Sequence, residues 1–114
     1  FDCYIAAGLV GESGQVVGVD MTDEMLQKAN QNAKAMELNN VGFEQGYLEE
    51  IPVEKNWADT VISNGVINLC VDKKRIFKEI LRILKPGGFL QFADIANSKA
   101  VPQEAINNIE LWTA

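Results

Sequence analysis

The feature that most constrains this chain is a short apolar strand that ends on a carboxylate and leads directly into an amphipathic helix. The strand is predicted over residues 15–20 and the helix over residues 22–37. In a doubly wound sheet, an acidic residue at the carboxyl end of such a strand accepts hydrogen bonds from the ribose hydroxyls of an adenosine cofactor. Alternatively, Asp20 only caps the next helix, where acidic residues are common. The pattern therefore makes Asp20 a candidate ribose ligand.

Strand and helix patterns alternate along the rest of the chain. Further strands are predicted over residues 41–46, 58–63 and 89–95, the second of them buried, and further helices over residues 1–9, 72–84 and 102–112. A tight turn is expected at residues 85–88, where proline and two glycines end a helix. This alternation predicts an α/β fold with a mainly parallel sheet, in one domain over residues 1–114.

Two of these helices have a predicted buried face. In the helix over residues 22–37, Thr22 is expected to be the N-cap. The residues expected on its shared apolar face are Met25, Ala29, Ala33 and Met36. The inward residues of the helix over residues 72–84 are expected to be Ile76, Phe77, Ile80, Leu81 and Leu84.

Composition narrows the classes of partner. The 114 residues carry a formal net charge of -6, which disfavours binding to a nucleic-acid backbone, and the basic cluster at residues 73–75 is expected to be a solvated helix face. No apolar run reaches the ~18 residues of a membrane span. Cys3 and Cys70 form no disulfide framework, so reduced thiols in a cytoplasm are expected. The chain has no histidine, and no metal site is expected. It also lacks an initiating methionine, so we expect its start to be cut or processed.

Four strings in register carry a family resemblance: VVGVDMTDEML, GYLEEIP, ADTVISNGVINL and LRILKPGGFLQFADI. Together they resemble the class I S-adenosylmethionine-dependent methyltransferases, in particular the ubiquinone/menaquinone-biosynthesis C-methyltransferases and the arsenite methyltransferases. The resemblance covers nearly the whole chain. It implies a Rossmann-like methyltransferase sheet with S-adenosylmethionine as the cofactor.

The resemblance also implies positions for the cofactor. Asp20 matches the ribose-binding acid, and Met21 the apolar residue laid against the adenine. Tyr47 stands where the family often has an aspartate, so the Leu48 backbone N–H is the alternative adenine partner. Asn64 and Gly65 match the place where the methionine part of the cofactor meets the acceptor. The other interpretations are an amphipathic residue at a strand end for Tyr47, and local turn bonding for Asn64 and Asn68.

One element of the family pattern is missing from this sequence. The family begins with a central strand and a G-x-G-x-G loop, whereas this chain opens on residues that match the following helix. The resemblance therefore predicts an incomplete fragment, without the first strand and the C-terminal strands. Unpaired ladder groups would cost about 1–3 kcal/mol each, so a monomer is not expected to keep the normal sheet. Either this sequence omits residues of a longer protein, which we favour, or self-association or another chain completes the sheet in trans.

The implied reaction is a direct displacement, in which a small-molecule acceptor attacks the sulfonium methyl group. The sequence marks no catalytic base. Cys3 matches a cysteine of the arsenite methyltransferases and is a candidate for acceptor binding, because thiolates suit a soft metalloid. That branch has a further cysteine where this chain has Gly65, and Cys70 cannot replace it. A non-catalytic remnant, a partner-completed module and an NAD-type dinucleotide-binding domain are the alternatives.

Overall fold

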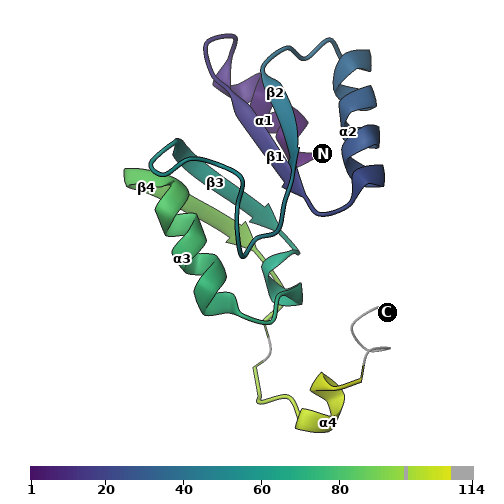
Figure 1. The fold of residues 1–114 in the computed structure, drawn as a ribbon, viewed down its shortest axis with the longest axis vertical. Helices are drawn as coiled ribbons and strands as arrows, with labels where there is room; N and C mark the ends of the chain where they lie inside the picture. The colour runs from purple at the N-terminus through teal and green to yellow at the C-terminus, as the bar shows by residue number, and fades with distance from the viewer. Residues whose placement is uncertain (97, 109–114) are drawn as a thin grey trace. The chain divides into compact units, whose positions relative to one another are not determined.

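The computed structural model describes residues 1–96 and 98–108, which form two compact units (Figure 1). The first unit is Phe1–Glu54, and the second begins at Lys55. Each unit has two parallel strands joined through a helix, so the described strands form two separate two-stranded sheets. The predicted α/β class with parallel strands is confirmed.

The first unit contains α1 (Asp2–Val10), β1 (Val16–Asp20), α2 (Asp23–Ala35) and β2 (Val41–Gln45). The two strands pair without a register shift, from Val16 opposite Val41 to Asp20 opposite Gln45. Tyr4 of α1 contacts both α2 and β2. Its hydroxyl donates to the Ala29 carbonyl at 3.1 Å, and its ring lies edge-on to Phe43 with the centroids 6.2 Å apart.

Asn40, directly before β2, connects three segments of the first unit. Its side-chain Nδ2 donates to the Ala7 carbonyl at 2.8 Å and to the Gly11 carbonyl at 2.9 Å. Its own carbonyl accepts from the Val16 N–H at 2.8 Å. The end of α1 and the first residues of both strands therefore meet at one residue.

The second unit contains β3 (Ala58–Asn64), the 3-10 turn η1 (Ile67–Leu69), α3 (Lys73–Ile83), β4 (Leu84–Ala93) and α4 (Gln103–Ile106). Asp72 caps α3, because its carboxylate accepts from the Arg75 N–H at 3.0 Å. The buried face of α3 consists of Ile76, Ile80 and Ile83. Phe77 adds an edge-on contact to Phe92 of β4, with the ring centroids 5.8 Å apart.

The turn predicted at residues 85–88 lies inside a strand. Ala58 pairs with Leu84 but Thr60 pairs with Phe89, so the Pro-Gly-Gly residues form an irregularity within β4. Gly87 supplies the left-handed backbone there, with φ 80°. The strand therefore begins at Leu84, five residues before the predicted start.

Side-chain burial corrects several predictions. Leu81 is 71% exposed, and Ile83 is buried in its place. Ala33 is buried as predicted, but Met25 and Met36 are each 55% exposed. The predicted buried strand at residues 58–63 is only partly covered: α3 lies on one face of the pair, and Ile62 stays 48% exposed.

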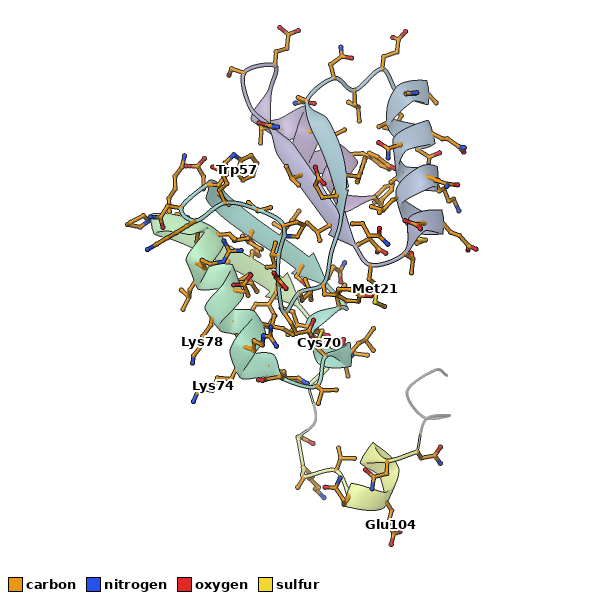
Figure 2. The ribbon with its side chains drawn as sticks, in the orientation of Figure 1. Met21, Trp57, Cys70, Lys74, Lys78 and Glu104 are labelled. Atoms are coloured by element: carbon orange, nitrogen blue, oxygen red, sulfur yellow. The ribbon has the colours of Figure 1, made fainter. Side chains whose placement is uncertain are left out.

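The C-terminal helix is shorter than predicted. It covers Gln103–Ile106, and the end of the predicted helix, residues 109–112, lies outside the described residues. Figure 2 shows Lys74 and Lys78 pointing away from α3, and the cluster at residues 73–75 is exposed as predicted. Within the described ranges, no helix is both long and apolar enough to cross a membrane.

Candidate functional site

Asp20, the last residue of β1, has one bonded and one open carboxylate oxygen. Its Oδ1 accepts from the Thr22 N–H at 2.8 Å and from the Thr22 hydroxyl at 2.9 Å. Among the described residues no donor bonds Oδ2. Thr22 is the N-cap residue of α2, as predicted, although its side chain makes no capping hydrogen bond to the helix. The hydroxyl holds the carboxylate instead, and it fixes one oxygen while the other stays available to a ligand.

The carboxyl ends of β1 and β2 are bonded to each other beyond the last ladder pair. The Gly46 N–H donates to the Asp20 carbonyl at 3.0 Å, and the Gln45 amide donates to the Met21 carbonyl at 3.3 Å. Met21, at the end of β1 in Figure 2, is 62% exposed, and Tyr47 is 63% exposed. The fold thus brings Asp20, Met21 and Tyr47 to one edge of the first unit, where doubly wound sheets bind ligands.

Leu48 lies in a tight turn directly after β2. The Glu50 N–H donates to the Tyr47 carbonyl at 3.1 Å and closes this turn. Within the part of the chain that the structure describes, no hydrogen bond uses the Leu48 N–H. Its backbone donor is therefore available at the same edge as the open Asp20 oxygen.

Asn64 and Gly65 belong to the second unit, at the carboxyl end of β3. Asn64 is exposed and is the last strand residue, opposite Ala93. Gly65 has φ 70°, a conformation that favours glycine, and its N–H donates to the Ala93 carbonyl at 2.9 Å. The segment after β3 is therefore bound to the end of β4. Asn68 makes a longer-range contact than the expected local turn bonding, since its N–H donates to Asp94 Oδ2 at 3.1 Å.

Sequence reasoning missed Thr22, Gln45 and Asp94 as supports of these edges. The Asp20-to-Thr22 spacing was a usable signal, because aspartate commonly bonds the N–H two residues on. The Gln45 and Asp94 bonds join residues 24 and 26 positions apart, and no local pattern predicts them.

Cys3 lies on the face of α1 that packs against the sheet. A Cβ atom on Gly18 would come within 3.0 Å of the Cys3 sulfur and 2.7 Å of the Phe43 ring, so these three residues are packed closely. Burial raises the pKa of the Cys3 thiol. Cys3 is therefore a packing residue in this structure, and its role toward an acceptor stays a prediction.

Comparison with known proteins decides the family. A family model described as "Methyltransferase domain" matches residues 1–113. This chain belongs to that methyltransferase domain family. An arsenite methyltransferase from Halobacterium salinarum is 40% identical over 91% of the chain, and a demethylmenaquinone methyltransferase from Bacillus cereus is 38% identical over 72%. The chain spans 27% and 35% of the length of these two relatives.

The fold of the family is also that of a solved structure. A SAM-dependent methyltransferase from Aquifex aeolicus superposes with a TM-score of 0.76 at 24% identity, covering 89% of this chain and 55% of that one. S-adenosylmethionine is the cofactor of this family. The described residues fit its adenosine end, because the edge of the first unit offers an open carboxylate oxygen, an unbonded backbone N–H and two exposed side chains.

Proposed function

We propose that the protein containing this chain transfers a methyl group from S-adenosylmethionine to a small-molecule acceptor. The observation that carries the proposal is Asp20, whose Oδ1 is held by Thr22 while Oδ2 is open. A carboxylate in this state is prepared to accept ribose hydroxyls, since the side chain does not have to be ordered again when a ligand binds. The family membership of the chain supports this assignment.

Each residue at this edge has a proposed part in binding. Asp20 accepts from the ribose, the Leu48 N–H donates to the adenine ring, and Met21 and Tyr47 cover its apolar faces. Asn64 and Gly65 have the part that the family resemblance implies for them, toward the methionine end of the cofactor. The cofactor supplies a methyl group activated by a positive sulfur, so the protein chiefly orients it and excludes water.

Titration with S-adenosylhomocysteine tests the ribose assignment. Asp20→Ala removes the accepting oxygens, and we expect binding to weaken by about 1.5–3 kcal/mol, the range for a hydrogen bond to a charged group. Thr22→Val keeps the carboxylate and removes only its hydroxyl partner, so we expect a smaller loss. Asp23→Ala, in the first turn of α2, is the matched control and should bind like the wild type. Equal affinity for Asp20→Ala and the control would refute the assignment.

A second candidate acceptor is trivalent arsenic. The 40% identical relative is an arsenite methyltransferase, and thiolates are suitable ligands for this metalloid. The close packing of Cys3 against Gly18 opposes an arsenic acceptor, because the thiol would have to move away from β1 and lose a proton to bind arsenic. A methyl-transfer assay with arsenite separates the two acceptors. Arsenite methylation that Cys3→Ser abolishes supports the metalloid, whereas no methylation favours an organic acceptor.

A further inference from the structure

We propose that Asp94 is a positioning residue that fixes the segment after β3, residues 64–70, and thereby shapes the part of the cofactor site that this segment forms. The second half of this inference rests on the proposed function. The first half rests on contacts within the second unit alone.

Asp94 lies directly after β4 and uses both carboxylate oxygens. Oδ2 accepts from the Asn68 N–H at 3.1 Å, and Oδ1 accepts from the Ile95 N–H at 3.0 Å. One residue earlier, the Ala93 carbonyl accepts from the Gly65 N–H at 2.9 Å. The end of β4 therefore holds the segment at two points, Gly65 and Asn68, and only the second depends on a side chain.

Packing alone leaves the segment weakly anchored. Ile67 is 3% exposed and fixes the middle of η1, whereas Val66 is 45% and Leu69 is 55% exposed. The Asn68 side-chain Oδ1 is buried without a partner among the described residues, so this side chain does not secure the turn through that atom. Backbone bonds close the turn itself, from the Leu69 N–H to the Val66 carbonyl at 3.0 Å and from the Cys70 N–H to the Ile67 carbonyl at 3.1 Å, and the charge-assisted bond from Asn68 to Asp94 attaches it to the end of β4.

The far end of the segment is held by a cation. Lys73, at the start of α3, donates through Nζ to the Cys70 carbonyl at 2.9 Å and to the Asn68 carbonyl at 3.5 Å. Asn68 thus has its N–H on a carboxylate and its carbonyl near an ammonium group. The two peptide groups that flank Asn68 are therefore each bonded to a charged side chain, and the bond to Asp94, at 3.1 Å, is the shorter of the two.

Amide hydrogen exchange and S-adenosylhomocysteine titration together test the proposal. In Asp94→Ala we expect the Asn68 amide to exchange about tenfold faster and the affinity to fall about tenfold, as for a lost bond to a charged group. Asp94→Asn keeps one accepting oxygen for two donors and should give intermediate values. Asp59→Ala is the matched control, because Asp59 pairs with Lys85 at the other end of β3 and should change neither quantity.

The combined results of amide exchange and titration distinguish a failure of this proposal from a failure of the proposed function. Unchanged exchange at Asn68 in both Asp94 variants would overturn the proposal that Asp94 fixes residues 64–70. Faster exchange with unchanged affinity would show that the segment does not shape the cofactor site, which also overturns the proposal. Thermal unfolding identifies a global loss of structure, and in that case the milder Asp94→Asn decides. If the wild-type protein that contains this chain fails to bind S-adenosylhomocysteine, the proposed function falls, while the exchange at Asn68 still tests whether Asp94 holds the segment.

Discussion

Gly18, in the middle of β1, is the position where adding one methyl group should be most informative. A Cβ there would lie 2.7 Å and 2.8 Å from two carbons of the Phe43 ring and 3.0 Å from the Cys3 sulfur. Atoms do not approach so closely without a shift, and the ring is a rigid group that also meets Tyr4 edge-on. Gly18→Ala must therefore displace the Phe43 ring, either within its site or together with β2.

The expected cost follows from two opposing effects. Overpacking of a core site costs about 1–3 kcal/mol. Replacing glycine in a strand returns about 0.5–1 kcal/mol, because alanine loses less backbone freedom on folding. We therefore expect Gly18→Ala to lower the free energy of unfolding by roughly 0–2.5 kcal/mol.

Gly42, in the adjacent strand opposite Val17, is the matched control. A Cβ on Gly42 meets nothing within 4 Å, so Gly42→Ala should be neutral or stabilise by about 0.4–1 kcal/mol. Thermal unfolding followed by far-UV circular dichroism compares the two, at about 4–8 °C per kcal/mol for a small domain. Fluorescence is less suitable, because both tryptophans, Trp57 and Trp112, come after Glu54, the last residue of the first unit. A midpoint for Gly18→Ala at or above that of Gly42→Ala would refute the packing described for the first unit.

Two further predictions concern α3 and Cys3. Ile76 is 0% exposed, so Ile76→Ala should cost about 2–5 kcal/mol in urea unfolding followed by Trp57 fluorescence, whereas the exposed Leu81→Ala should stay within about 0.5 kcal/mol of wild type. Burial raises the pKa of Cys3 above 9.0, so the unfolded thiol ionises first as pH rises. The free energy of unfolding should therefore fall above that pH, and Cys3→Ser should flatten this fall in a pH series of urea titrations.

Equal midpoints for the two α3 variants would mean that the buried face has been assigned to the wrong side of the helix. For Cys3, an alkaline fall of the same size in the wild type and in Cys3→Ser would show that another group is responsible.

The local signals in the sequence were sufficient to predict β1 and the position of Asp20 at its end. A short continuous apolar run at residues 16–19 that ends on Asp20 and is followed by helix-favouring residues leaves little choice of structure. The buried face of α3 was harder to predict, because apolar residues lie on both sides of its inward-facing stripe. Only the contact with β4 decides that Ile83 is buried and Leu81 exposed.

Two other features depended on partners distant in the sequence. Pro86 and the glycines after it favour a turn, but pairing with β3 continues the strand through them as an irregularity. Asp94 gave no signal of its own, since its partner Asn68 is brought to it only when β3 and β4 pair. The candidate site residues of the first unit could be named from the sequence, whereas the bonds that hold them could not.

The position of Asn40 has a consequence for the opposite end of the same strands. Its contacts with α1 and with Val16 determine which residues of β1 and β2 begin the ladder. Successive side chains of a strand point to opposite faces, so a slip of one residue at this end would turn Asp20 to the other side of the sheet. The orientation of the carboxylate that we assign to ribose binding is thus set four residues away from it along β1, by an asparagine that would never touch the ligand.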